Sequence, residues 1–516
     1  MDKKTINKIA KYFFLLSFFF YLYTIFLFII GSYEVDIFDG SLRILSKIYI
    51  VRGLTPYRDF SVVYPPGIFL VFGKIFPYLS IIQNNIIQSL FYILLTTSIL
   101  LMLGFRNRKT VGLYCQLAIV ILFISAVIRI FESSEAFSLL LLLLNVLLLL
   151  NYIKRQSIKP LFFAFAVTFA SVWFRWDWML FLHGLYFLIF ISFRLTTKKN
   201  AFVLVTLFRY IRLSLLAYLL SLSLLLFYLQ KLNVLKSAID FIFVIPVFLT
   251  TSYRDLPLPI PKHPLRPEIL IYLCIVIYVY LLIRSSKKIA ISSLGNQHLS
   301  KLLSSVILLS YPLVFVLYAI GRSDWLHAVP LWFAVSIIWV LLNKSLNLFS
   351  QTKLFIILLT FLPLAAWYVK VSYILVPRYN FARYQIDLQT SDCRRLTNNV
   401  PGKSIFVGRL SYDKFLWNNA SLYLVRSDLK PASSFITEEP GIHNSCKYGK
   451  IIAGELQVSQ KPMLAVLAKK PQEPENKKTR EMKSCGQIER YLQSNDFTKI
   501  GSCQSLGEDY EVRLYN

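Results

Sequence analysis

The stretch that decides the fold lies near the start of the chain, where residues 12–31 read YFFLLSFFFYLYTIFLFIIG without a single charge. A helix of about 20 apolar residues crosses the roughly 30 Å of hydrocarbon in a bilayer. A basic segment precedes this run, and no cleavage site with small residues follows it, so it does not match a signal peptide. We therefore interpret it as a first membrane span that the protein retains.

Comparable runs continue through most of the 516 residues, of which 56% are hydrophobic. The mean hydropathy is +0.57. A chain of this composition has more apolar surface than a single soluble core can bury. We predict a mainly α polytopic membrane protein with about 11 transmembrane helices. The predicted spans begin near Tyr12, Gln88, Val111, Ala136, Pro160, Trp178, Leu213, Ile269, Leu302, Ala328 and Leu354.

The basic residues predict the orientation. The net charge is +29, but Lys and Arg lie in short clusters between apolar runs, which is typical of cytoplasmic loops and not of a nucleic-acid-binding surface. If the N-terminus is cytoplasmic, the loops on that side are strongly basic and Asp2 is their only acid. We expect an integral protein of the bacterial inner membrane that contacts membrane lipids, with an extracytoplasmic C-terminal domain. The basic segments are 1–11, 104–110, 151–159, 194–212, 284–301 and 343–353.

Almost all acids fall on the predicted outer side, chiefly in residues 32–88, in 231–268 and in the tail from about 370. Acids beside a membrane that do not set its orientation are candidates for chemistry, although outer loops are also polar for ordinary solvation. Residues 40–52 have apolar positions at helical spacing, which predicts a helix in the membrane interface. Residues 63–82 predict a second interfacial or re-entrant helix. Asp36 and Asp39 precede the first helix, where Asp39 is either an N-cap or a general base.

The first outer loop resembles a known family. Residues 56–60 read PYRDF and residues 64–67 read YPPG, and with Asp39 they are similar to the first outer loop of GT-C glycosyltransferases. The closest likeness is to bacterial membrane proteins of the glycosyltransferase family 39-like group. The resemblance implies a polyprenyl-phosphate sugar as donor, a catalytic base at Asp39, with Asp36 as second candidate, and substrate binding by Arg58 and Asp59. Gly40 stands where many relatives have Glu, so no metal pair is indicated and the cofactor remains unknown.

Two further outer segments carry candidate substrate-binding residues. Residues 253–259 read YRDLPLP, and the stiff Pro-rich chain next to Arg254 suits a guanidinium that holds phosphate. Residues 175–178 read RWDW, so Arg175 and Asp177 lie between aromatic rings that suit either the membrane interface or the face of a sugar. The alternative for each is an ordinary interfacial residue.

Another outer segment with candidate substrate-binding residues is 321–327, which reads GRSDWLH. Arg322, Asp324 and His327 lie within one turn at a membrane boundary, where charges are costly. Arg322 and His327 suit phosphate oxygens and Asp324 suits a positioning role, whereas a local Arg–Asp pair that ends a helix is the structural alternative. A similar turn occurs in the resembled family.

The tail has a different composition. We predict domains at 1–376, the GT-C-like membrane part, and at 377–516, a small extracytoplasmic α/β domain in which helices and strands alternate. We expect its strands at 404–407, 463–468 and 511–515 and its helices at 415–425, 446–456 and 487–493. Its motifs at 430–432 and 439–441 also resemble the family. Four of the six cysteines are in this tail, where an outside location permits disulfides in any of three pairings. The cysteine and histidine spacings do not indicate zinc.

These observations predict a membrane glycosyltransferase that moves a sugar from a polyprenyl-phosphate donor to a cell-envelope glycan, lipid or protein. Rival interpretations are an oligosaccharide polymerase or ligase, a transporter of lipid-linked glycans, and a membrane anchor for the tail. The predicted catalytic residues are Asp39 and Asp36, and the predicted substrate-binding residues are Arg58, Asp59, Arg175, Asp177, Arg254, Arg322, Asp324 and His327.

Overall fold

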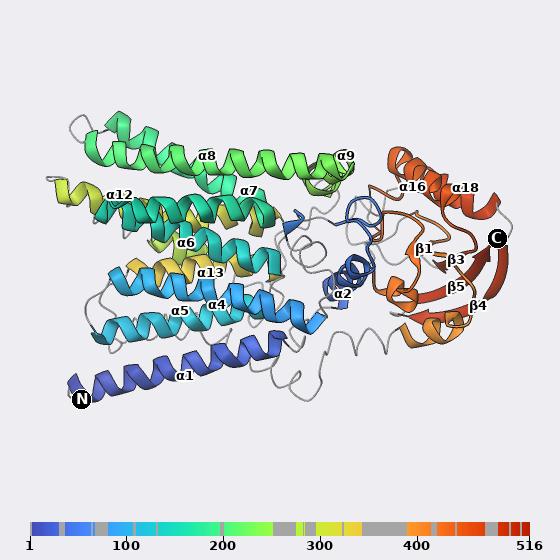
Figure 1. Ribbon diagram of the computed structural model, residues 1–516, viewed down its shortest axis with the longest axis horizontal. Coiled ribbons are helices and arrows are strands. Elements are labelled where there is room, and N and C mark those ends of the chain that lie inside the picture. The colour runs from blue at the N-terminus through green and yellow to red at the C-terminus, as the bar shows by residue number, and fades with distance from the viewer. Residues whose placement is uncertain are drawn as a thin grey trace. The chain divides into compact units, whose positions relative to one another are not determined.

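The computed structural model is mainly helical, with a small sheet near the C-terminus (Figure 1). The fold therefore agrees with the expected helical membrane protein that carries a small mixed domain. The described residues are 3–29, 37–62, 65–67, 81–106, 110–130, 133–196, 201–250, 275–281, 283, 296–321, 325–342, 390–413, 420–438, 441–469, 483–494, 497–505 and 508–516.

Within these described ranges, 5 helices are long and apolar enough to cross a membrane, and they lie in α1, α4, α6, α7 and α8. Their length and composition support a membrane protein, whereas the predicted number of about 11 spans is not confirmed. The long helices are α1 (Lys3–Ile29), α4 (Ile81–Arg106), α5 (Thr110–Ile130), α6 (Ser133–Arg155), α7 (Ile158–Thr196), α8 (Ala201–Lys231), α12 (Asn296–Gly321) and α13 (Trp325–Leu342).

Helix α7 folds back on itself at Arg175, whose φ of −152° and ψ of 88° are not helical. Thr168 and Tyr186 both bind the side chain of Asn145 in α6, Thr168 at 3.0 Å and Tyr186 at 3.5 Å. On one straight helix these two residues would be about 27 Å apart, so they could not share a partner. The two arms of α7 therefore run side by side, as expected for two spans joined at residues 175–177.

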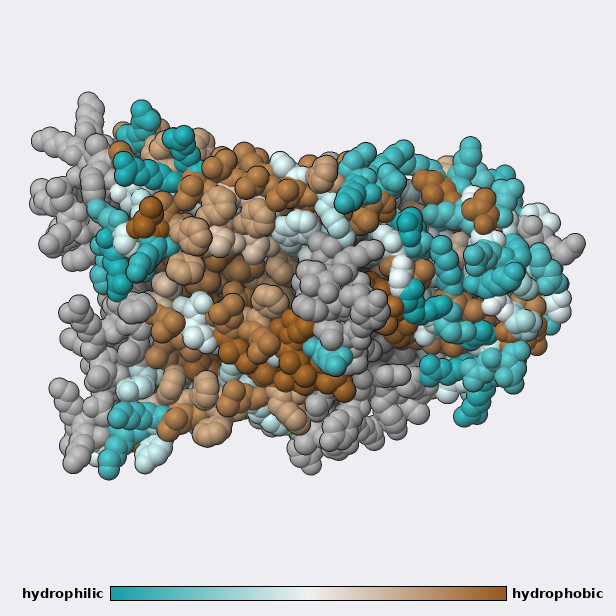
Figure 2. Space-filling view, in the orientation of Figure 1, coloured by the Kyte–Doolittle hydropathy of each residue, from teal (hydrophilic) through white to brown (hydrophobic). Residues whose placement is uncertain are grey.

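The core of the bundle forms around α6. Leu139, Leu142 and Leu143 of this helix have no exposed surface. The hydroxyl of Tyr311 donates to the Leu139 carbonyl at 3.0 Å and thereby links α12 to α6. Many large apolar side chains on α4, α7 and α8 are exposed instead, among them Phe227 at 69%, and brown surface covers these helices in Figure 2. Exposed apolar helix faces of this kind suit contact with lipid.

The tail contains a five-stranded sheet of order β2-β1-β3-β5-β4. The first three strands in this order run parallel, and β5 and β4 pair antiparallel at one side. Helix α16 (Cys446–Val458) precedes β3. Its N-cap is Ser445, whose hydroxyl accepts the Tyr448 N–H. Helix α18 (Gln487–Ser494) precedes β4. The strands are β1 (Ser404–Arg409), β2 (Lys430–Pro431), β3 (Met463–Ala468), β4 (Phe497–Ser505) and β5 (Glu508–Tyr515).

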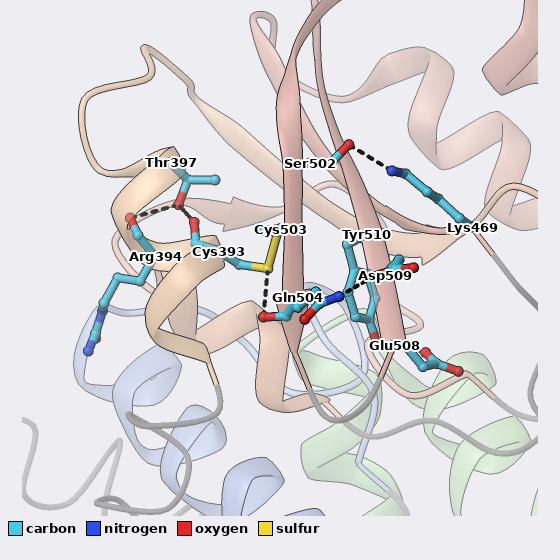
Figure 3. The surroundings of a disulfide bond; sticks show 10 residues. All are labelled: Cys393, Arg394, Thr397, Lys469, Ser502, Cys503, Gln504, Glu508, Asp509 and Tyr510. Atoms are coloured by element: carbon cyan, nitrogen blue, oxygen red, sulfur yellow. Dashed lines mark hydrogen bonds between the residues drawn. A yellow bond between two sulfur atoms is a disulfide. The ribbon is translucent and has the colours of Figure 1, made fainter.

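Two disulfides join the four tail cysteines, which selects one of the three possible pairings. Cys393 bonds Cys503 and so ties the helix at 390–397 to β4, as Figure 3 shows. Cys446 bonds Cys485 and so ties the start of α16 to the segment before α18. Each bond closes a non-local loop within the tail.

Contacts divide the chain into two compact units. The first unit contains residues 1–30, 85–227 and 256–374, which are the helices of the bundle. The second contains residues 31–84, 228–255 and 375–516, so the first outer loop groups with the tail. The predicted boundary at residue 376 lies outside the described residues and stays a prediction.

Candidate functional site

Helix α2 (Ile37–Val51) is the amphipathic helix expected after the first span. Leu45 and Tyr49 are fully buried on its inner face, and its C-terminal half packs against η3 (Ala420–Arg426) of the tail. Asp39 lies in the first turn of α2. The dipole of a helix favours a carboxylate at this end. The side chain of Asp39 and the whole of Asp36 lie outside the described residues, so both assignments stay predictions.

The C-terminal end of α2 is closed by a Schellman arrangement. The N–H of Gly53 donates to the Ile50 carbonyl at 2.9 Å, and the N–H of Leu54 donates to the Tyr49 carbonyl at 2.9 Å. Gly53 has a φ of +83°, the left-handed conformation that this motif requires. The turn directs the chain away from the helix and presents Arg52 at its end.

Arg52 binds three consecutive backbone carbonyls of the tail. Its guanidinium donates to the carbonyls of Ser427 and Asp428, and to that of Leu429 at 3.1 Å. The carbonyls belong to the segment between η3 and β2. A planar guanidinium has several donors in fixed directions, so it fixes this segment relative to the end of α2.

The segment that Arg52 binds is itself held to the rest of the tail. Arg426 forms a two-pronged pair with the Asp428 carboxylate, with its Nη2 2.9 Å from Oδ2. The same guanidinium donates to the carbonyls of Thr397 and Val400 at 2.9 and 2.8 Å. Hydrogen bonds thus connect the end of α2 with the helix at 390–397.

The turn after α2 holds Asp59 in a defined position. The N–H of Asp59 donates to the Thr55 carbonyl at 2.9 Å, and the N–H of Thr55 donates back to the Asp59 carboxylate at 2.7 Å. Tyr57 is buried with a φ of +67°, and its N–H donates to the Phe60 carbonyl at 2.8 Å. This compact turn directs the Asp59 side chain inward.

Asp59 pairs with two cations from distant parts of the sequence. Arg58 lies 3.0 Å from one carboxylate oxygen, and Lys430 of β2 lies 2.9 Å from the other. Only 5% of the Asp59 side chain is exposed, against 58% of Arg58 and 45% of Lys430. The buried carboxylate therefore holds two half-exposed basic side chains of the second unit in place.

The surroundings of Asp59 favour its charged form. Burial alone raises the pKa of this carboxyl, but the hydrogen bonds from Arg58, from the Thr55 N–H and from Lys430 together lower the pKa below its usual 3.8. A carboxylate with a depressed pKa and several donors is a poor proton acceptor. Asp59 is thus suited to orienting cations, while the half-exposed guanidinium of Arg58 is suited to an anionic ligand.

The first unit has its own ionic cluster, at the point where α7 folds back. The Arg175 guanidinium donates to both oxygens of Asp177, at 3.0 and 2.8 Å, and to Glu135 of α6 at 3.3 Å. Its carbon lies 4.4 Å from the ring centre of Trp178. Arg175 and Glu135 are mostly buried, whereas 41% of the Asp177 side chain is exposed. Arg175 therefore holds the turn together, and Asp177 presents the accessible face of the cluster.

The side chains of the remaining predicted residues lie outside the described part of the chain. His327 lies in the first turn of α13, but its side chain is outside the described part of the chain. Arg254, Arg322 and Asp324 lie outside it entirely, so their roles stay predictions. Among the described residues, no group of three His, Cys, Asp or Glu side chains is placed to hold a metal ion.

Sequence reasoning missed several ionic residues of the second unit. It assigned no ionic role to Arg52, or to Lys430 in the motif at 430–432, and the partners of both lie more than 370 positions away. It also missed Arg409 at the end of β1, which is 1% exposed and lies 3.0 Å from Glu438 and 3.3 Å from Glu508. Arg409 could have been found from its place at the end of an apolar strand. A cation that is buried there needs carboxylate partners.

Comparison with known proteins leaves the family resemblance as a prediction. No protein-family model matches this sequence, and no curated protein matches it significantly. The functional argument therefore depends on the motifs, on the two ionic clusters and on the way the chain groups into units.

Proposed function

We propose that the protein is a membrane glycosyltransferase that transfers a sugar from a polyprenyl-phosphate donor to an acceptor on the outer face of the bacterial inner membrane. One observation carries most of the argument. The three longest segments that the basic loops predict to be outside are residues 32–88, residues 231–268 and the tail from about 370. They largely coincide with residues 31–84, 228–255 and 375–516, which group into a single compact unit. Distribution of charge and folding contacts are independent properties, and they agree on which segments belong together.

The number of helices supports the same sidedness. A unit with an exposed sheet cannot straddle hydrocarbon, because its polar backbone would be left without partners. The chain between residues 84 and 228 must then cross the bilayer an even number of times. Counting α5 with the candidate spans α4, α6, α8 and the two arms of α7 gives six crossings, which is an even number. Helix α1 precedes the unit and separates it from the N-terminus.

The disulfides also favour an outer location for the tail. Cys393–Cys503 and Cys446–Cys485 both lie in the second unit. Disulfides persist in oxidising compartments such as the periplasm or the cell surface, and they are rare in the cytosol. A tail that faces the envelope would also meet a polymeric acceptor directly.

The proposed reaction assigns roles to the outer residues. Asp39 accepts the proton of the acceptor hydroxyl while the hydroxyl oxygen forms a bond to the anomeric carbon. The bond from that carbon to the phosphate oxygen breaks, and polyprenyl phosphate leaves with the electron pair. Arg254, Arg322 and His327 offset the charge of the phosphate, and each such electrostatic contact is worth roughly 3 kcal/mol of barrier. Arg58 adds a further cation, and Asp177 offers an acceptor for sugar hydroxyls.

The test is a comparison of glycolipids and surface glycans by mass spectrometry in a deletion strain. We expect the strain to lack a sugar that the wild-type gene restores and that Asp39→Asn does not restore at equal protein abundance. Asp392→Asn, which changes an exposed acid of the tail, serves as the matched control and should restore the sugar. Full restoration by Asp39→Asn would refute the assigned base. Shortened glycan chains in place of a missing sugar would instead favour a polymerase or ligase.

A further inference from the structure

Helix α2 is held at its C-terminal end by polar contacts with the tail. At its C-terminal end, Arg52 binds the carbonyls of residues 427–429 and the following turn binds Lys430 through Asp59. All these contacts lie within the second unit. The other end of the helix carries Asp39, the proposed base. The described polar anchors from the tail thus lie at the end of the helix opposite to Asp39.

We infer that the tail is a positioning device for α2, in which Arg52 and Lys430 set the tilt of the helix and thereby the place of Asp39. This inference rests on the proposed function. Arg52 and Lys430 act through the helix and do not contact the substrate, so they are positioning residues. The soluble tail would then govern the rate of a reaction that takes place at the first outer loop.

The polar anchors matter because packing alone does not fix a direction. Leu45 and Tyr49 are buried and α2 packs against η3, but hydrophobic contact is non-directional and permits a helix to change its tilt. The Arg52 guanidinium and the Asp59–Lys430 pair have defined geometries, and Asp59 is shielded from solvent. These two anchors therefore add the directional restraint that apolar packing lacks.

The length of α2 amplifies small movements at the anchors. Asp39 precedes Arg52 by 13 positions, so about 20 Å of helix separates them at 1.5 Å per residue. A tilt of about 5° at the anchored end would move the first turn by roughly 1.7 Å over that length. Misplacement of a catalytic group by about 1 Å can lower a rate by roughly 100-fold. Loss of either anchor is thus expected to slow the reaction without removing any group that reacts.

The experiment uses the purified full-length chain in lipid nanodiscs. Hydrogen exchange is followed by mass spectrometry in α2 and, as an internal reference, in β1 and β3. Sugar transfer is followed with the donor and acceptor that the glycan comparison identifies. The variants are Lys430→Gln and Arg52→Gln, with Lys430→Arg as the conservative change and Lys450→Gln as a control at an exposed lysine of α16.

We expect Lys430→Gln and Arg52→Gln to speed exchange in α2 while β1 and β3 stay protected. We also expect kcat to fall by about 10- to 100-fold with KM nearly unchanged, and Lys430→Arg to recover most of the rate. A rise in KM at constant kcat would overturn the inference, because it would mean that these cations bind substrate. Wild-type exchange in α2 for both glutamine variants would overturn it as well. If the wild-type protein transfers no sugar, the proposed function fails, and the exchange measurement alone decides whether the anchors hold α2.

Discussion

At the scale of single residues, Asp59 is an acid of the first outer loop whose side chain has a structural role. The sequence placed it among candidate substrate-binding residues, in a motif with Arg58. The structure surrounds it with the Thr55 N–H, Arg58 and Lys430, which leaves little of the carboxylate accessible. Its neighbour Arg58 remains half exposed and is the better candidate for contact with an anionic ligand.

The lowered pKa of Asp59 predicts a specific acid sensitivity. The folded state favours the carboxylate, so the stabilising effect is complete above the usual pKa of 3.8 and is lost as the pH falls through the lower folded value. We expect Asp59→Asn to unfold at a lower temperature than wild type at pH 7, and the difference to shrink below about pH 4. Thermal unfolding followed by tryptophan fluorescence between pH 7 and pH 3 measures this. A difference that stays constant down to pH 3 would contradict the ion-pair interpretation.

Arg175 offers a second residue-scale prediction, in the first unit. Arg175→Leu would leave Glu135 nearly buried without its guanidinium partner, and breaking such a pair costs about 3 kcal/mol. Asp177→Asn changes a carboxylate that is 41% exposed and should cost under about 1 kcal/mol. Unfolding of the detergent-solubilised protein with increasing SDS compares the two variants. Equal losses would mean that the Glu135 pair does not stabilise the turn.

At the scale of elements, the end of α2 depends on one backbone conformation. An added Cβ at Gly53 would meet no atom within 4 Å, so Gly53→Ala tests the cost of its positive φ without steric overlap. We expect a loss of about 1–2 kcal/mol in the stability of the second unit. Gly454→Ala, in the interior of α16, is the matched control and should be neutral or stabilise by up to about 1 kcal/mol. Chemical denaturation monitored by exchange in β1 distinguishes the two, and equal effects would refute the strain argument.

The sequence predicted regular elements well where the local pattern is complete. The apolar run at Met463–Ala468 coincides with β3, and the amphipathic pattern at 40–52 corresponds to α2. Strand β4 was missed because its sequence, FTKIGSCQS, combines polar residues with a glycine and lies mostly exposed at the end of the sheet. The segment at 415–425 was expected to be an α-helix, but Ala420–Arg426 forms a 3-10 helix. Its contacts with α2 are non-local, and no sequence window contains both.

At the scale of the whole molecule, the disulfides close long loops in the tail. Cys393 and Cys503 are 110 residues apart, and closing a loop of that size stabilises a domain by about 4–5 kcal/mol in the chain-entropy model. We expect a Cys393→Ser and Cys503→Ser double variant to melt the sheet at a markedly lower temperature. The control is the double serine variant at Cys446 and Cys485, whose loop of 39 residues is shorter and should contribute less. Thermal unfolding of both proteins in nanodiscs makes the comparison, and the reverse order would contradict it.

The candidate site could be predicted only in part, for a physical reason. Charge patterns placed Asp39, Arg58 and Asp59 on one predicted side of the membrane, and the motifs suggested a function. Lys430, which pairs with Asp59, and the carbonyls that bind Arg52 lie beyond residue 426, and a single sequence contains no signal that pairs positions so far apart. The grouping of three discontinuous segments into one unit therefore had to come from the structure.

This discontinuity also sets an order of events during synthesis. Arg52 and the carbonyl of Ser427 are 375 positions apart in the chain. At about 5–20 residues per second, the ribosome needs roughly 20–75 s to deliver the partner after the loop has emerged. For that interval Arg52 lacks the carbonyl partners that anchor it, so the first outer loop is without these contacts. A chain that is truncated before residue 427 would contain the N-terminal helices, but its first outer loop would lack the backbone partners of Arg52.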